Sequence, residues 1–197
     1  WMATLPVTAY VLGSAAAAMP VSWMQAHWGR RRSFQFGLCV AMLACALGAY
    51  AVASRNFWLL LVATVVAGFY AANAALYRFA GPELVAPSYK EKAISYVLAG
   101  GIVGAFIGPN LASASRDLLS VPFAGAYLVL IGVAAVALVA VSLIDFAPHT
   151  APVKGASSGR PLKDIVRQPV FIVAVTAAAL GYGVMNLLMA ATPIAMQ

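Results

Sequence analysis

Two methionines in the last apolar run of the chain are spaced so that they could hold one metal ion. Met185 and Met189 are four residues apart, so they lie on one face of a helix. Thioether sulfur is a soft ligand that suits Cu(I) and poorly suits hard cations. A methionine pair at this spacing is also typical of core packing, because methionine fills irregular gaps. Both a copper site and a packing contact therefore stay open.

A second group of side chains could bind a small solute. Tyr70, Asn73 and Tyr77 recur at helical spacing and form a polar and aromatic stripe. Such a stripe is costly against lipid, which favours a position facing a cavity or another helix. Substrate binding and interhelical hydrogen bonding are both compatible with it. Arg78, the next residue, either reaches the lipid headgroups or pairs with a loop acid such as Glu83.

The remaining reactive side chains give no basis for an enzyme. The carboxylates fall in loops or at the ends of apolar runs, and they are Glu83, Glu91, Asp117, Asp145 and Asp164. Intramembrane acids are the usual carriers of coupling protons. No nucleophile elbow, zinc helix or phosphate loop occurs. Cys39 and Cys45, six residues apart, point away from one another on a helix and cannot bridge. We expect no catalytic residue and no cofactor, with copper possible only as cargo.

Composition and run length predict an all-α membrane protein. Hydrophobic residues make up 63% of the chain and charged residues 9%. Six apolar runs reach the roughly 20 residues that a helix needs to cross the hydrocarbon core. The runs are approximately Ala3–Gln25, Ser33–Ser54, Phe57–Phe79, Ala93–Ser113, Pro122–Asp145 and Pro169–Ala191.

The basic residues predict how the runs are threaded. Ten lie in the loops after the first, third and fifth runs, namely Arg30, Arg31, Arg32, Arg78, Lys90, Lys92, Lys154, Arg160, Lys163 and Arg167. The other two loops hold only Arg55 and Arg116. The positive-inside rule places the first set in the cytoplasm. The net charge of +7 is then explained by topology and anionic lipid, and we expect no nucleic acid partner.

A proline- and glycine-containing segment divides the chain into unequal parts. We predict a five-helix bundle over residues 1–145, a cytoplasmic linker over 146–168 and one further helix over 169–197. Within the linker, Pro161–Arg167 has the spacing of a short interfacial helix. The chain begins at Trp1 and stops shortly after the sixth run, so we expect further helices on both sides.

Two motifs could serve conformational switching. Gly29, Arg30 and Arg31 follow the first run, where glycine allows a tight turn and guanidinium groups can hold helix ends. In the fourth run, glycines recur every fourth residue before a proline and leave a groove that another backbone can approach closely. This second motif consists of Gly100, Gly104, Gly108 and Pro109.

Together these features resemble the major facilitator superfamily of secondary transporters. Its loop between helices 2 and 3 carries a Gly-x-x-x-Asp-Arg-x-Gly-Arg-Arg pattern, and its helix 5 often carries a glycine-rich stretch ending in Gly-Pro. The chain keeps Gly29, Arg30 and Arg31, whereas Ala26 stands where the family has its acid. The resemblance implies helices 2 to 7 of a twelve-helix bundle that works by alternating access in the inner membrane.

The run from Met185 to Met196 also resembles helix 7 of a bacterial copper-importing branch of this superfamily, associated with assembly of cbb3-type cytochrome oxidase. The resemblance implies that Met185 and Met189 bind copper, with a partner pair in the next helix. Three hypotheses follow: a copper importer, a transporter of a small organic solute such as a drug, vitamin or metabolite, and a non-transporting assembly factor. The expected partners are the lipid bilayer, the solute or copper ion, and the remaining helices of the same protein.

Overall fold

A computed structural model describes residues 4–146 and 162–195, and throughout these residues the regular structure is entirely helical. The elements are α1 (Leu5–Ala53), α2 (Phe57–Ala74), α3 (Tyr77–Ala80), η2 (Gly81–Glu83), η3 (Pro87–Tyr89), α4 (Lys90–Ala114), α5 (Ala124–Leu143), α6 (Leu162–Val166) and α7 (Pro169–Ala195). The predicted all-α class is confirmed. The short helix expected near Pro161–Arg167 is α6.

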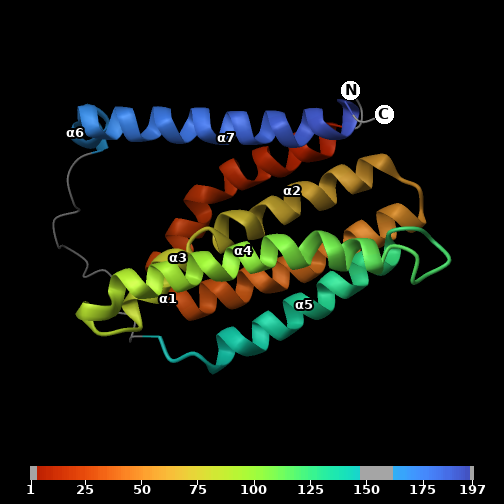
Figure 1. The fold of residues 1–197 in the computed structure, drawn as a ribbon, viewed down its shortest axis with the longest axis horizontal. Helices are drawn as coiled ribbons and strands as arrows, with labels where there is room; N and C mark the ends of the chain where they lie inside the picture. The colour runs from red at the N-terminus through yellow and green to blue at the C-terminus, as the bar shows by residue number, and fades with distance from the viewer. Residues whose placement is uncertain (1–3, 147–161, 196–197) are drawn as a thin grey trace. The chain divides into compact units, whose positions relative to one another are not determined.

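Helix α1 contains two of the predicted spans. At 49 residues, it would be roughly 70 Å long if straight, more than twice the thickness of the hydrocarbon core. The backbone of Gly29 leaves the helical region, with φ 80° and ψ 167°. In Figure 1 the chain turns back at this bend, so that residues 5–28 and 30–53 run in opposite directions. Within the described residues five helices are long and apolar enough to cross a membrane, and α1 is long enough for two passes.

The chain divides into two compact units, Trp1–Ala151 and Pro152–Gln197. The boundary falls inside the predicted linker 146–168, most of which lies outside the described residues together with Lys154 and Arg160. Helices α1 to α5 make up the described part of the first unit. Helices α6 and α7 make up that of the second.

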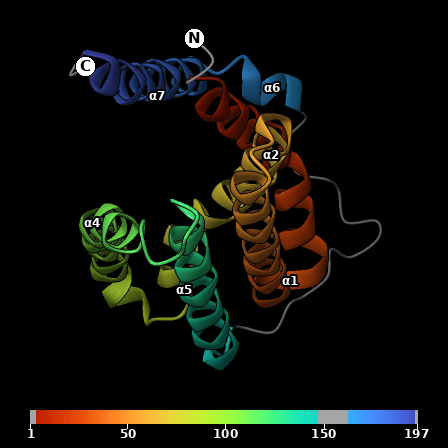
Figure 2. The ribbon, with the colours of Figure 1, turned by 90° about the vertical axis from the view of Figure 1, so that its right-hand side faces the viewer.

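The first unit is centred on α1, which packs against both α2 and α5. The largest fully buried apolar side chains are Phe34, Leu38 and Val21, all from α1. By contrast, α4 contributes no buried residue and contacts chiefly η2 and α5. Figure 2 shows α4 standing away from α1 and α2. Helix α4 continues through Pro109 up to Ala114.

The tightest contact joins the first half of α1 to α2 through glycines. A Cβ atom added to Gly68 would lie 2.5 Å from the carbonyl oxygen of Tyr10, and one added to Gly13 would overlap the carbonyl oxygen of Val65. Only residues without side chains allow two helix backbones to approach this closely. The crossing fixes residues 5–28 against α2.

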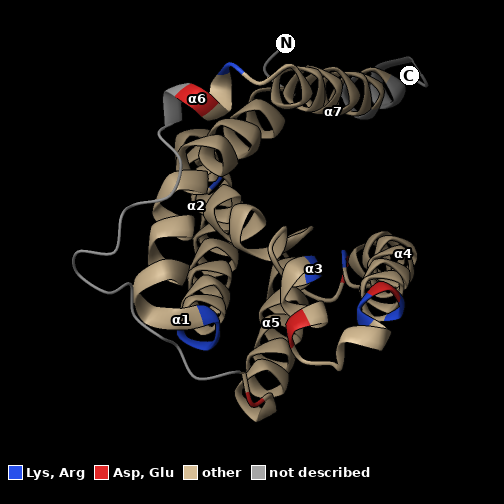
Figure 3. Ribbon diagram, turned by 90° about the vertical axis from the view of Figure 1, so that its left-hand side faces the viewer, with Lys and Arg blue, Asp and Glu red and all other residues tan. Residues whose placement is uncertain are grey.

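Charged residues of the first unit gather at the end that holds the α1 bend. Figure 3 looks towards this end and shows basic segments at the bend, in α3 and at the start of α4, with acidic segments in η2 and at the end of α5. The α1–α2 and α4–α5 loops, with Arg55 and Arg116, lie at the opposite end (Figure 1). The predicted separation of basic loops between two ends of the bundle therefore holds within this unit.

A polar clamp and an aromatic cavity as candidate functional site

Arg30, directly after the Gly29 bend, binds one partner on each side of it: Gln25 in the first half of α1 and Glu83 in η2. Its Nε and Nη2 atoms donate to the two carboxylate oxygens of Glu83, both at 2.5 Å, and its Nη1 donates to Oε1 of Gln25 at 3.1 Å. Paired donation of this kind is the strongest geometry available to an arginine and a carboxylate. The Arg30 side chain is 26% exposed, so part of the pair is shielded from water. This bond ties the α1 bend to the end of η2.

The neighbouring residues tie the same bend to α5. An Nη2 atom of Arg31 donates to the backbone carbonyl of Ser142, and Gln35 donates to the Ser142 hydroxyl at 2.8 Å. Asp145 lies 3.8 Å from Arg31 and is fully exposed, so water screens this ion pair. We call Arg30, Arg31, Gln35, Glu83 and Ser142 the clamp. It holds the α1 bend, the end of η2 and the end of α5 together.

The suggested pairing of Arg78 with Glu83 is wrong. The Arg78 guanidinium lies over the ring of Phe79, 5.0 Å from its centroid, while Glu83 binds Arg30. The reason is geometric: η2 follows α3 and turns Glu83 towards the α1 bend. Sequence reasoning missed this partner because 53 residues separate it from Arg30.

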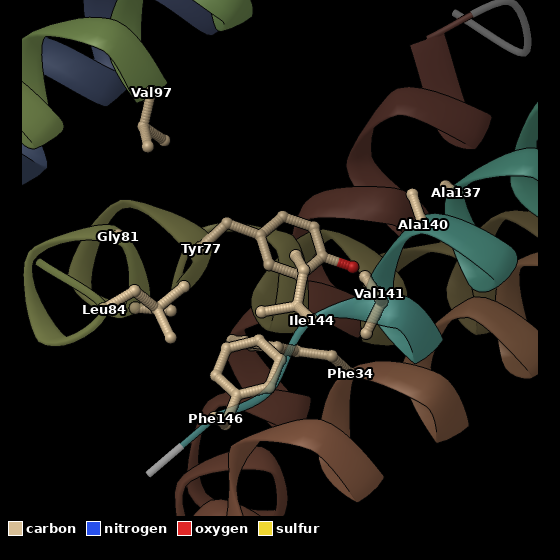
Figure 4. Close-up of a pocket in the computed structure, with 11 residues that line it drawn as sticks. Phe34, Tyr77, Gly81, Leu84, Val97, Ala137, Ala140, Val141, Ile144 and Phe146 are labelled. Carbon is tan, nitrogen blue, oxygen red and sulfur yellow. The ribbon is translucent and has the colours of Figure 1, made fainter.

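Beside the clamp lies a half-open cavity of about 310 Å³ lined almost entirely by apolar atoms. Figure 4 shows Phe34, Tyr77 and Phe146 around it, with Val141 and Ile144 from the end of α5. The Phe34 ring packs edge-on against Tyr77, with centroids 4.5 Å apart, and against Phe146, with centroids 5.8 Å apart. The volume is at the lower end of the range for ligand sites. The Phe34 ring is inclined by 64° to Tyr77 and by 63° to Phe146, so the cavity wall presents both ring faces and ring edges.

The predicted stripe divides between two environments. Asn73 is fully buried, and its Nδ2 donates to the backbone oxygen of Ser33 at 2.9 Å. A Cβ on Gly37 would meet the Asn73 amide at 2.7 Å, so a glycine makes room for this contact. Tyr77 instead lines the aromatic cavity, and its buried hydroxyl makes no hydrogen bond of ordinary geometry within the described residues. Tyr70 is half-buried, one helical turn before Asn73.

The comparison with protein families covers nearly the whole chain. A sequence model described as the Major Facilitator Superfamily matches residues 2–197. The chain belongs to the major facilitator superfamily.

Curated relatives agree with this membership. The chain is 34% identical to "Riboflavin transporter RfnT" of Brucella anthropi over 198 aligned residues, which cover 99% of the chain and 50% of that protein. It is 26% identical to "Uncharacterized MFS-type transporter YddS" of Bacillus subtilis, over 83% of the chain and 38% of that protein. The chain spans half or less of the length of these relatives. No solved structure matches it significantly.

The superfamily part of the predicted resemblance is thus confirmed, while the copper-importing branch receives no support from these relatives. Met185 lies on α7 and is 47% exposed. The side chain of Met189 is not among those that the structure describes. Among the residues that the structure describes, no group of three or more histidine, cysteine or acidic side chains could hold a metal ion. The copper site on Met185 and Met189 remains a prediction.

The two motifs predicted to serve conformational switching occupy different surroundings in this chain. Gly29 forms the α1 bend, and Arg30 and Arg31 belong to the clamp. The glycines of α4 are open: a Cβ at Gly100, Gly104 or Gly108 would meet nothing within 4 Å. The close-approach groove expected there is therefore unfilled by the described residues. Its role in switching stays a prediction.

Proposed function

We propose that this chain belongs to a secondary transporter that carries a small organic solute across a cell's inner membrane by alternating access. The observation that carries the proposal is the 34% identity to a riboflavin transporter over nearly the entire chain. The aromatic cavity supports it, because Phe34, Tyr77 and Phe146 offer edges and faces to a flat ring system. Riboflavin is therefore the first solute to test.

In this mechanism the clamp stabilises one of the two access states. Alternating access needs helices that move as rigid bodies and change partners at their ends. Arg30 and Arg31 hold η2 and α5 to the α1 bend, which keeps the cytoplasmic end of these helices together. The open glycine face of α4, with Gly100, Gly104, Gly108 and Pro109, is the surface that would repack during the exchange.

Tyr77→Phe is the sharpest test of solute contact. The change keeps the ring that packs on Phe34 and removes only the buried hydroxyl. We expect the KM for riboflavin uptake by the full-length protein in vesicles to rise about fivefold, the value of one hydrogen bond, with little change in maximal rate. Tyr50→Phe, at an exposed tyrosine of α1, is the matched control and should leave KM unchanged.

An unchanged KM in Tyr77→Phe would remove this tyrosine from the solute site without affecting the transporter proposal. Failure of the wild-type protein to carry riboflavin would instead exclude that solute, and failure to carry any organic solute would favour the assembly-factor hypothesis. Asn73 is a weaker candidate for solute contact than Tyr77, because its side chain is fully buried and its amide already donates to Ser33. Tyr70 stays in the proposed site as the neighbour of Tyr77.

Copper import is the second candidate, and the observation that favours it is the pair of soft ligands on one face of α7. Met185→Leu combined with Met189→Leu keeps side-chain volume and removes both sulfurs. A copper importer would lose most cellular copper uptake in this double variant, whereas an organic-solute transporter would keep its riboflavin uptake. Copper accumulation equal to wild type excludes the copper candidate.

A further inference from the structure

Two further cavities lie towards the end of the first unit opposite the clamp. The larger cavity, about 390 Å³, is lined by residues from the end of α1, the start of α2, the end of α4 and the start of α5, including Val52, Leu60, Ala112 and Tyr127. A smaller cavity of about 140 Å³ shares Tyr127 and Leu130 with it. Tyr127 and Leu130 therefore form a common wall of the two cavities.

These cavities extend from the membrane boundary inward. The lining residues on α1 run from Val52 in the larger cavity to Cys45 in the smaller one, which is about 10 Å along a helix. Gly48 lies between them and leaves room for the Tyr127 ring, because a Cβ there would lie 2.5 Å from a ring carbon. The Tyr127 ring therefore lies between the smaller cavity and the larger one, and the larger one is the cavity next to the two loops.

The outer rim of this space carries positive charge. Arg116 lies in the loop between α4 and α5, with its guanidinium 4.7 Å from the ring centroid of Phe123, which lines the larger cavity. Arg55 lies in the loop between Val52 and Leu60 and is exposed. The acid near the rim is Asp117, 3.8 Å from Arg116 and 80% exposed. Two cations and one anion leave the rim net positive.

The backbone of Phe123 is held in an unusual conformation at this rim. Its φ is 67°, in the left-handed region that a bulky residue rarely adopts. Its N–H donates to the carbonyl oxygen of Arg116 at 2.9 Å, which closes the loop and keeps the ring beneath the guanidinium. Strained residues of this kind concentrate where a structure must position a contact.

We propose that this rim and the larger cavity behind it bind one anionic phospholipid, with its phosphate at the rim that carries Arg116 and Arg55 and one acyl chain in the larger cavity. The rim lies where two loops meet apolar spans, which is the level of the headgroups in a bilayer. An anionic lipid is the molecule that presents a negative phosphate at that depth and a flexible apolar chain below it. The site is separate from the clamp and the aromatic cavity.

The test titrates full-length protein in neutral detergent with phosphatidylglycerol and, separately, with phosphatidylcholine, and counts bound lipids by native mass spectrometry. Wild type should retain phosphatidylglycerol at lower concentrations than phosphatidylcholine. Arg116→Gln should weaken phosphatidylglycerol binding about fivefold, the usual effect of one basic residue near an anionic lipid. Lys92→Gln, which removes a cation at the other end of the unit, should leave it unchanged.

Two further variants separate the charge from the cavity. Asp117→Asn removes the acid beside Arg116 and should tighten phosphatidylglycerol binding by about two- to fivefold, a gain that misfolding cannot produce. Ala112→Phe fills the cavity from α4, which has no buried residue, and should weaken both lipids. The proposal is overturned if the two lipids bind wild type equally, if Arg116→Gln and Asp117→Asn leave binding unchanged, or if Ala112→Phe has no effect.

Discussion

Glu83→Arg should reduce solute uptake at least about tenfold, and adding Arg30→Glu should restore much of it. The single change places two cations at the distance where Arg30 now forms two 2.5 Å charge-assisted bonds. Such bonds contribute roughly 1.5–3 kcal/mol, and their loss separates η2 from the α1 bend. The measurement is the initial rate of uptake into vesicles that hold equal amounts of each variant, with riboflavin as the first solute.

Arg32→Glu is the matched control for the Arg30 exchange. Arg32 lies in the same turn and is exposed, and within the described residues it forms no ion pair. Its reversal changes the net charge of the loop by the same amount, so a general effect of charge on topology or insertion would affect it equally. Equal losses in Arg32→Glu and in Arg30→Glu alone, or no recovery in the exchanged pair, would contradict the role of the clamp.

The acid of the family pattern is missing from this chain, so the Glu83 variant removes the main carboxylate that binds Arg30. Ala26 stands where the superfamily has an aspartate, and the carboxylate that binds Arg30 comes instead from η2. Gln25, the residue before Ala26, contributes only a neutral acceptor to Arg30. Glu83 therefore supplies the main negative charge to this arginine, and the chain offers no duplicate among the described residues.

Sequence predicted the helices and the glycine bend because both depend on local properties. A run of about 20 apolar residues must be helical in hydrocarbon, whatever surrounds it. Gly29 was assigned to a tight turn from its place between a span and three arginines, and its positive φ agrees. The lengths of the runs matched α2, α4, α5 and α7 to within a few residues, apart from the end of the third run, where α3 and η2 follow α2.

Most partners within the site could not be predicted, because the pairs that join different helices link residues far apart in the chain. Arg31 and Ser142 are 111 positions apart, and Asn73 and Ser33 are 40 apart. Helical spacing placed Asn73 and Tyr77 in one stripe, yet it carries no information on which neighbour each one meets. The structure assigns Asn73 to a helix contact and Tyr77 to a cavity.

The glycines also show that sequence spacing does not predict which helices are in contact. The spacing of Gly100, Gly104 and Gly108 suggested a close approach, and these three are open within the described residues. Gly13 and Gly68 belong to no sequence pattern, yet they form the closest helix contact of the unit. A glycine motif identifies a surface that could accept a backbone, whereas the presence of a partner depends on the fold.

Gly68→Ala should lower the thermal stability of the purified protein by about 5 °C and reduce its yield in the membrane. The added methyl group would lie 2.5 Å from the Tyr10 carbonyl oxygen and 2.6 Å from the Ser14 nitrogen, and backbone atoms cannot rotate away as a side chain can. Forced overpacking of this kind costs about 1–3 kcal/mol, which corresponds to a shift of several degrees in Tm. The measurement is a thermal unfolding scan in detergent.

Gly132→Ala on α5 is the control for this substitution. A Cβ there would meet nothing within 4 Å, and alanine is the better helix former, so Tm should stay the same or rise slightly. Gly13→Ala strains the same crossing from the other side, because its Cβ would overlap the Val65 carbonyl. Once Gly68→Ala has pushed the two helices apart, Gly13→Ala should cost less than it does alone, since neighbouring substitutions in one contact are not additive. A full sum of the two losses, or a wild-type Tm for Gly68→Ala, would mean that α1 and α2 do not cross at these glycines.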